Sequence, residues 1–252
     1  MLETAITAAK LAGETLEYYF ETVFEHEEKD DKSVVTKADL EADKVIIKTI
    51  QAKFPNHSIL TEENGLIGKE SRFKWIIDPL DGTLTFSRGI PIFAVSIALQ
   101  EDAETKLAVV YNPAIKSLFQ AEKGRGAFWN EERVAVSTRD WQSDVVVTLG
   151  RGWGQKEKEK TFEIYKKLFY KAKSERIFGS AALELAWVAS GRTEAFVSVG
   201  LKNWDVLAGL LLVSEAGGKI TDFAGKEITD ESQYIVASNG KIHEELLEVI
   251  NA

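Results

Sequence analysis

Two carboxylates stand three residues apart in the run Asp78-Pro79-Leu80-Asp81-Gly82-Thr83. Pro79 restricts the backbone angle φ, and Gly82 can adopt angles that other residues avoid. Asp78 closes the apolar run at residues 73–77, where a carboxylate has no packing role. Two carboxylates and the Leu80 carbonyl are the oxygen ligands that hard divalent cations require. The run therefore predicts a cation site, and the alternative is an Asx turn with a capping aspartate.

Two further acidic positions could complete such a site. Glu62 and Glu63 follow the apolar run at residues 58–61, and Asp205 opens a predicted helix directly after Trp204. Taken singly, each is more often a helix cap or a surface charge. A helix or turn beginning at Gly82 would also present free N–H groups that suit phosphate oxygens. Together these residues would form a carboxylate cluster beside a phosphate site if the fold brings them together.

The elements that must position these residues include both helices and strands. Apolar residues at three- and four-residue spacing predict an opening helix over residues 2–23 and a second helix capped by Thr36 and stopped by Pro55. The expected strands are residues 73–77, 92–99, 107–111, 117–121, 145–149, 194–199 and 235–237, with a hairpin at 124–136. Further helices are expected at residues 156–170, 180–189, 204–216 and 242–249. We expect two closely packed parts, an N-terminal α+β half at residues 1–138 with most metal ligands and a C-terminal α/β half at 139–252 that completes the site.

Composition excludes several classes of protein. The chain has 252 residues, a formal net charge of -9 and no cysteine. Disulfides, thiolate zinc sites and cysteine nucleophiles are thus excluded, and nucleic acid or an anionic membrane is not the expected partner. The N-terminus lacks the pattern of a signal peptide, and no apolar run approaches a membrane span of ~20 residues. We expect a soluble cytoplasmic protein.

The chain resembles the inositol monophosphatase family along nearly its whole length. The resemblance is carried by three segments: Thr61-Glu62-Glu63, Trp75-Ile76-Ile77-Asp78-Pro79-Leu80-Asp81-Gly82-Thr83, and Trp204-Asp205 through Gly217-Gly218. It implies an α+β or α/β fold, a layered αβαβα sandwich, and Mg²⁺-dependent hydrolysis of a phosphate monoester with two or three ions. The implied metal ligands are Glu62, Asp78, the Leu80 carbonyl, Asp81 and Asp205.

The same resemblance assigns the remaining roles. Glu62 and Thr83, with Asp39 as the partner of Thr83, would orient the attacking water. Asp81 and the N–H groups of Gly82 and Thr83 would contact the phosphate. The small-residue loop Gly179-Ser180-Ala181 would lie beside the substrate. The implied substrate contacts outside the turn are Arg176, Ala181, Ser198 and Lys202.

The substrate is less well defined than the chemistry. Ser198 stands where inositol-specific relatives usually carry an acidic residue, while Arg176 resembles an arginine of dual inositol monophosphatase/fructose-1,6-bisphosphatase members. Lys202, in a Leu-Lys pair, also resembles histidinol phosphatases. Inositol-1-phosphate is the leading candidate, and the alternatives are fructose-1,6-bisphosphate, histidinol phosphate and a 3′-phosphonucleotide. Classes without hydrolysis, a partner-binding scaffold or a cation-binding protein, also remain open, and the resemblance implies a homodimer.

The segment Gly150-Arg151-Gly152-Trp153-Gly154 superficially resembles a dinucleotide loop but lacks the third glycine at the required spacing. We interpret it as a flexible loop near the mouth of the site.

Overall fold

The structure is a computed structural model that describes residues 1–20, 27–28, 34–229 and 232–252. Its helices are α1 (Leu2–Tyr19), α2 (Lys37–Lys53), α3 (Thr83–Ser87), α4 (Gln155–Phe169), α5 (Ala181–Ala189), α6 (Asn203–Glu215) and α7 (His243–Asn251). The opening helix is shorter than predicted, because Phe20 already takes an extended backbone conformation at its end. Val23, expected in that helix, lies outside the described residues. Thr36 caps α2 as predicted and forms a reciprocal capping box with Asp39.

The described strands form one large, one smaller and one very short sheet. The large sheet follows the order β10 (Glu132–Val134), β9 (Gly126–Trp129), β8 (Ser117–Glu122), β7 (Glu104–Asn112), β6 (Ala94–Glu101), β5 (Phe73–Asp81), β3 (Ser58–Thr61) and β4 (Gly65–Ile67). The smaller sheet follows the order β12 (Ser174–Arg176), β11 (Val146–Arg151), β13 (Ala195–Val199), β15 (Tyr234–Ser238) and β14 (Lys219–Thr221). A short ribbon joins β1 (Glu27–Glu28) to β2 (Val34–Val35). The strands β1 to β4, β12 and β14 were not predicted from the sequence, and each has only two to four residues.

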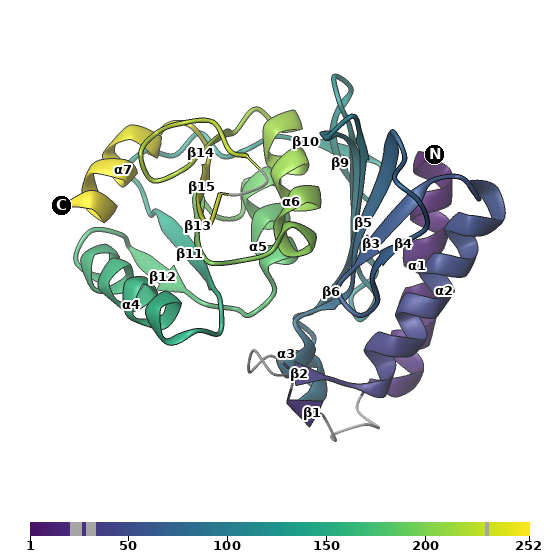
Figure 1. Ribbon diagram of the computed structural model, residues 1–252. Coiled ribbons are helices and arrows are strands. Elements are labelled where there is room, and N and C mark those ends of the chain that lie inside the picture. The colour runs from purple at the N-terminus through teal and green to yellow at the C-terminus, as the bar shows by residue number, and fades with distance from the viewer. Residues whose placement is uncertain (21–26, 29–33, 230–231) are drawn as a thin grey trace.

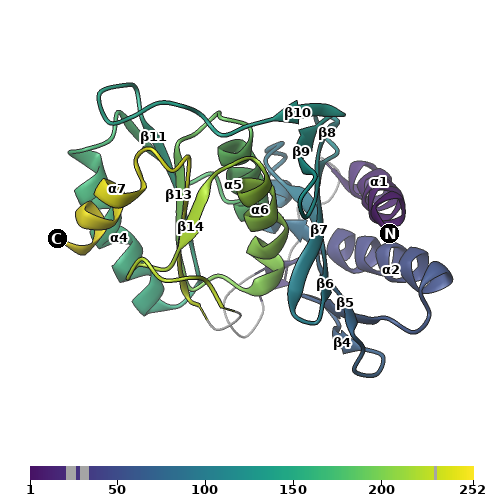
Figure 2. The same cartoon turned by 90° about the horizontal axis from the view of Figure 1, so that it is seen from above.

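Helices and sheets alternate in five layers (Figures 1 and 2). The helices α1 and α2 cover the outer face of the large sheet, α5 and α6 lie between the two sheets, and α4 and α7 cover the outer face of the smaller sheet. Three apolar clusters fill the four spaces between these layers, because one cluster occupies both sides of the middle layer. The prediction of a layered αβαβα sandwich is confirmed.

The middle layer belongs to both halves of the chain. Its apolar cluster contains Ile76 and Phe119 from the large sheet, Phe196 from the smaller sheet, and most of α5 and α6. Gly209 of α6 lies so close to α5 that an added Cβ would meet Leu185 at 2.4 Å. The division at residues 138 and 139 falls in the connector between β10 and β11. The division into two closely packed halves stays a prediction.

A buried histidine joins the last elements of the chain. His243 of α7 lies 2.8 Å through Nδ1 from the hydroxyl of Ser238 and 2.9 Å through Nε2 from the hydroxyl of Thr221. Burial lowers the pKa of His243 from 6.5 to about 4. The imidazole is therefore neutral in the folded protein over the whole range in which an unfolded histidine gains its proton.

We expect His243 to make the protein sensitive to acid. Because the pKa of His243 is lower in the folded than in the unfolded state, the folded protein has its full stability above the unfolded pKa of 6.5. It loses stability as the pH falls toward 4, since only the unfolded chain takes up the proton in that range. The loss approaches about 3 kcal/mol, from ~1.4 kcal/mol per pKa unit. Urea unfolding of the wild type and of His243→Gln at pH 7.5 and pH 4.5 measures it. An identical pH dependence in both proteins would contradict this assignment.

Candidate metal centre and phosphate site

The run Asp78–Asp81 forms the end of β5 (Phe73–Asp81). Its pairing with β6 loses regular register between Asp78 and Asp81, where Pro79 has no N–H to donate. The strand thus continues to Asp81 through an irregularity, whereas the sequence indicated that it closes at Asp78. The Asp78 carboxylate accepts a hydrogen bond from the Leu80 N–H at 2.9 Å. The Asx turn considered as an alternative is therefore present, and it coexists with the carboxylate cluster described below.

Glu62 reaches the same place because β3 and β5 are parallel neighbours. The carboxyl ends of parallel strands meet at one edge of a sheet, and the Glu62 N–H donates to the Ile77 carbonyl at 3.1 Å. A buried residue of α2 holds the following turn. Asp43 accepts hydrogen bonds from the Thr61 hydroxyl at 3.0 Å and from the Asn64 side-chain amide at 2.6 Å. The sequence analysis missed this supporting role of Asp43.

Asp205 lies in the first turn of α6, which belongs to the middle layer. Its carboxylate accepts the Lys202 N–H at 2.8 Å, so it caps its own helix. The hydroxyl of Ser96, which pairs with Asp78 across the sheet, donates to the Trp204 carbonyl at 3.2 Å. This contact holds the start of α6 against the end of β5. Both readings of Asp205 in the sequence, helix cap and member of a cluster, therefore apply.

The three carboxylates of Glu62, Asp78 and Asp205 converge. One oxygen from each lies within 4.8 Å of the other two. Oxygens on opposite sides of a Mg²⁺ ion are about 4.2 Å apart, since each lies ~2.1 Å from the ion. Neighbouring oxygens around the same ion are only about 3.0 Å apart. The three carboxylates would therefore enclose a divalent cation after side-chain movements on the order of 1 Å.

The electrostatics of the cluster also favour a cation. Burial, followed by the charges of Glu62, Asp81 and Asp205, raises the pKa of Asp78 well above its usual value. Burial and the charge of Asp81 likewise raise the pKa of Asp205. Burial raises the pKa of Asp81 to about 6, against the opposing effect of its hydrogen bonds. A bound cation would offset this mutual repulsion.

Asp81 is oriented from the middle layer. Its Oδ2 accepts the Ser180 hydroxyl and the Ala182 N–H, each at 2.7 Å. Gly82, the next residue, has a φ of 97°, and an added Cβ would lie 2.8 Å from the Ile92 carbonyl oxygen. Only glycine fits this position without strain. The short helix α3 follows at once, as the sequence allowed.

Thr83 and Asp39 lie together, although 44 positions separate them in the chain. The Thr83 hydroxyl lies 3.0 Å from Asp39 Oδ1 and 3.0 Å from the Leu80 carbonyl oxygen. Asp39 Oδ2 accepts the N–H of Thr36 at 2.8 Å and its hydroxyl at 2.6 Å. Burial raises the pKa of Asp39 to about 7, although these donors oppose the shift.

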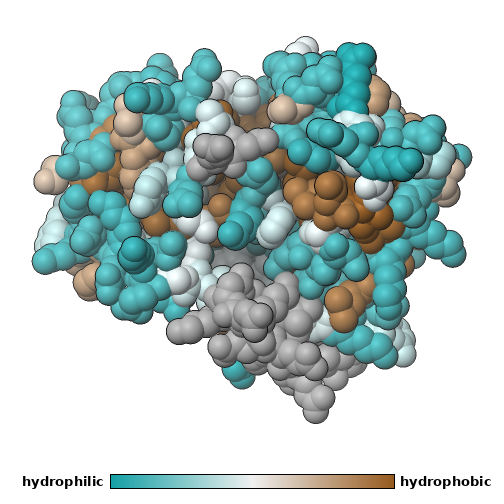
Figure 3. Space-filling view, in the orientation of Figure 1, coloured by the Kyte–Doolittle hydropathy of each residue, from teal (hydrophilic) through white to brown (hydrophobic). Residues whose placement is uncertain are grey.

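A cavity of about 280 Å³ opens over these groups. Figure 3 shows the face of the molecule seen in Figure 1, on which hydrophilic residues predominate and hydrophobic residues form smaller patches. The lining residues are Glu62, Asp78, Leu80, Asp81, Gly82, Thr83, Leu84, Thr85, Leu149, Gly150, Arg151, Trp153, Ile177, Phe178, Gly179, Ser180, Ala181, Glu184, Leu201 and Asp205. Its size lies near the lower end of the ~300–1,000 Å³ of small-molecule sites. Its lining combines several carboxylates with several apolar side chains.

The predicted substrate contacts divide into two groups. Ala181 lines the cavity beside Gly82 and Thr83. Arg176 and Lys202 are exposed and do not line it, and Ser198 is fully buried in β13. Substrate binding by these three residues stays a prediction that the geometry does not favour.

Three further residues of the cavity wall were given no role in the site on the basis of the sequence. Arg151 and Trp153 were assigned to a flexible loop, but Arg151 ends β11, and both line the cavity. No role was predicted for Glu184, which lies within an apolar helix. A lone carboxyl group among apolar residues was the available signal, because such a group is buried only for a reason.

The sequence profile of the Inositol monophosphatase family matches residues 1–252. A fructose-1,6-bisphosphatase/inositol-1-monophosphatase of Thermotoga maritima is 41% identical over 220 residues, which cover 87% of this chain and 83% of that protein. The Nus factor SuhB of Escherichia coli K12 is 42% identical over 251 residues, 98% of this chain and 94% of that protein.

Solved structures agree with the sequence match. The extragenic suppressor protein SuhB of Bartonella henselae superimposes with a TM-score of 0.94 at 36% identity and covers 99% of this chain and 97% of its own. An IMPase of Thermotoga maritima superimposes with a TM-score of 0.92 at 37% identity, with coverages of 99% and 96%. Fold and carboxylate cluster together define a phosphatase-type sandwich. The chain belongs to the inositol monophosphatase family.

Among the described residues, no helix combines the length and the apolar run that a membrane crossing requires.

Proposed function

We propose that the protein hydrolyses a small phosphate monoester with Mg²⁺, with inositol-1-phosphate as the leading substrate. The observation that carries this proposal is the convergence of Glu62, Asp78 and Asp205 in the wall of a cavity that also contains Gly82 and Thr83. Two or three Mg²⁺ ions would be held by Glu62, Asp78, the Leu80 carbonyl, Asp81 and Asp205. When bound, Mg²⁺ supplies charge neutralisation for the phosphoryl oxygens and activation of the attacking water.

The chain's own groups complete the proposed chemistry. The Thr83 hydroxyl donates toward Asp39, so its lone pairs can accept a hydrogen bond from water and direct that water at phosphorus. Glu62 would take up the proton of the water. The N–H groups of Gly82 and Thr83 would bind a phosphoryl oxygen, and water would attack phosphorus in line without a covalent intermediate. The bond between phosphorus and the ester oxygen would break in the same step, and the departing alkoxide would take up the proton lost by the water and leave as the alcohol.

A substrate panel tests this proposal. Phosphate release would be measured from inositol-1-phosphate, fructose-1,6-bisphosphate, histidinol phosphate and a 3′-phosphonucleotide, with Mg²⁺ and with an excess of chelator. We expect the highest kcat/KM for inositol-1-phosphate and no release with chelator. Absence of release from all four would instead support a partner-binding protein on this fold, an alternative that the name of the Nus factor relatives keeps open. By resemblance we also propose that the protein is a cytoplasmic homodimer. Light scattering of the purified protein tests its oligomeric state.

Fructose-1,6-bisphosphate is the second candidate because of Arg151. It is the one cationic side chain among the described residues that line the cavity. Its guanidinium carbon lies 5.5 Å from the centre of the Trp153 ring, which restricts its orientation. No carboxylate of the described residues forms an ion pair with it. A guanidinium group in this place suits a second phosphate, which it can bind through two hydrogen bonds.

We predict that Arg151→Gln discriminates between the two substrates. The variant should lower kcat/KM for fructose-1,6-bisphosphate about tenfold or more, since a hydrogen bond to a charged group contributes ~1.5–3 kcal/mol. The value for inositol-1-phosphate should change less than about twofold. Arg192→Gln is the matched control, because Arg192 stacks on Trp129 and does not line the cavity. Equal losses on both substrates would show that Arg151 does not bind a second phosphate.

A further inference from the structure

Glu184 is an unusual residue in the middle layer. It lies on α5, whose other residues are alanine, leucine, valine and one tryptophan. Its side chain is 1% exposed to solvent, yet it forms part of the cavity wall. A carboxyl group costs free energy to bury unless its oxygens find hydrogen-bond donors. The contacts of Glu184 therefore indicate what it does.

The side chain of Glu184 folds back over the start of its own helix. Its Oε1 accepts the N–H groups of Phe178 and Gly179, each at 3.1 Å. Both N–H groups precede α5 and belong to no strand or helix. The loop at residues 177–180 is thus attached to the helix by one carboxyl oxygen.

That loop supplies one of the two donors that orient Asp81, and the first turn of α5 supplies the other. Ser180 and Ala182 both donate to Asp81 Oδ2, as described above. The carbonyl oxygen of Gly179 would lie only 3.2 Å from a Cβ at Gly82, so the loop packs tightly against the metal-site turn. A displacement of the loop would therefore remove the Ser180 donor and allow the Asp81 carboxylate to turn about its remaining bond to Ala182.

We infer that Glu184 is a positioning residue of the metal site, which holds the loop at residues 177–180 and through it fixes the orientation of the Asp81 carboxylate. The inference rests on the proposed function in one respect, the role of Asp81 as a metal ligand. Glu184 itself touches neither metal nor substrate in this role. Groups that orient metal ligands typically contribute about 10–100-fold to metal affinity.

The role requires a hydrogen-bond acceptor and no charge. Burial raises the pKa of Glu184 to about 8, so the carboxyl group is mostly protonated at neutral pH. Glutamine has the same length and keeps one acceptor oxygen. Glu184→Gln should therefore preserve the loop, whereas Glu184→Leu removes the acceptor and leaves two N–H groups without their partner.

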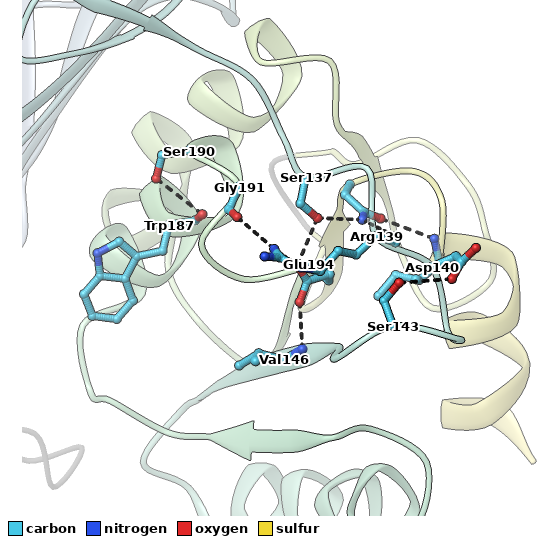
Figure 4. A network of polar contacts seen from close by, with 11 residues as sticks. Ser137, Arg139, Asp140, Ser143, Val146, Trp187, Ser190, Gly191 and Glu194 are labelled. Atoms are coloured by element: carbon cyan, nitrogen blue, oxygen red, sulfur yellow. Dashed lines mark hydrogen bonds and ion pairs between the residues drawn. The ribbon is translucent and has the colours of Figure 1, made fainter.

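Glu194 provides a matched control. It is also a buried glutamate, 1% exposed, and it accepts the Val146 N–H at 2.7 Å and the Ser137 hydroxyl at 2.9 Å (Figure 4). Arg139 pairs with it at 3.2 Å. It lies just before β13, at the end of the strand opposite to the cavity, and it does not line the cavity. Glu194→Leu should lower the melting temperature without an effect on the metal site.

The experiment measures two properties of the whole chain: the Mg²⁺ concentration for half-maximal phosphatase activity, and the rise in melting temperature caused by Mg²⁺ alone. For Glu184→Leu we expect a Mg²⁺ requirement about tenfold higher and a smaller Mg²⁺-induced rise. Glu184→Gln should stay within about threefold of the wild type. Glu194→Leu should match the wild type in both properties.

Two results would overturn the inference: a Glu184→Leu protein with a lower melting temperature but an unchanged Mg²⁺ requirement, or a Glu184→Gln protein as impaired as Glu184→Leu. If Glu184→Leu does not fold, Glu184→Asp replaces it, since the shorter side chain cannot reach both N–H groups. An unchanged Mg²⁺ requirement of that variant would equally overturn the role. If the wild type shows no phosphatase activity, the proposed function fails, and the Mg²⁺-induced rise in melting temperature still tests Glu184.

Discussion

Asp78→Asn is expected to abolish metal-dependent phosphate release. The variant keeps the volume and the hydrogen bond to the Leu80 N–H but removes the charge that a cation requires at the centre of the cluster. Loss of a ligand should cost several kcal/mol of transition-state stabilisation, or roughly 10³-fold or more in kcat/KM. Phosphate release at saturating Mg²⁺ measures the effect.

The same variant is expected to be more stable than the wild type when Mg²⁺ is absent. Asp78 is buried among like charges, so its ionised form destabilises the metal-free protein at neutral pH. Asparagine removes this repulsion, and a gain of ~1 kcal/mol would raise the melting temperature by about 2–4 °C. The opposite signs of the effects on activity and stability distinguish a metal ligand from a structural residue.

Asp144→Asn is a suitable control for Asp78→Asn. Asp144 is exposed and lies 3.8 Å from Lys173 in a surface ion pair, so its replacement should change neither property. A destabilised Asp78→Asn protein that retains activity would contradict the assignment of the metal centre.

Mg²⁺ is expected to stabilise the folded protein strongly. A ligand that binds only the folded state at 100 times its Kd contributes ~2.7 kcal/mol per site. For a chain of this length that corresponds to a rise of about 5–10 °C in melting temperature. Thermal unfolding with Mg²⁺ and with chelator measures it, and K⁺ at equal ionic strength is the control. Equal melting temperatures in all three solutions would contradict a metal centre.

The stabilisation by Mg²⁺ should increase with pH. Burial raises the pKa of Asp81 from 3.8 to about 6 in the metal-free protein. The metal-free protein therefore loses stability as the pH rises from the unfolded-state pKa of this group to its folded-state pKa, because the unfolded chain releases the proton first. Mg²⁺ requires the ionised form, so protons compete with it over the same window. The Mg²⁺-induced rise should be smaller at pH 5 than at pH 8, and the reverse order would contradict this sign.

Much of the fold followed from the sequence because its elements are long and regular in period. The apolar spacing at the start of the chain predicted α1, and the hairpin at Asn130 and Glu131 was recognised from its turn residues. Both residues indeed have positive φ, at 45° and 72°. The strands β4, β12 and β14 were missed because three residues carry no periodicity. Their pairing depends on neighbours distant in the chain.

The candidate site was predictable where side chains are close in sequence. Asp78 and Asp81 share one strand end, Glu62 and Asp205 were recognised as further candidate carboxylates, and the family resemblance added Asp39. The structure brings these side chains into the same region. Arg151, Asp43 and Glu184 were not recognised, since each belongs to a regular element and acts on residues from another element. The exposed positions of Arg176 and Lys202 could not be foreseen from their spacing alone.

The sequence by itself determined the chemistry of the Asp78–Thr83 turn. Any fold would have to accommodate these local properties: a proline without a donor, a glycine with free backbone angles, and two carboxylates three residues apart. Only the tertiary structure decided which groups surround the turn. The parallel pairing of β3 with β5 brings Glu62, the packing of α6 between the sheets brings Asp205, and the start of α5 brings Ser180 and Glu184. Proximity across layers depends on how apolar faces pack, and that packing leaves no trace in the local spacing of the residues it brings together.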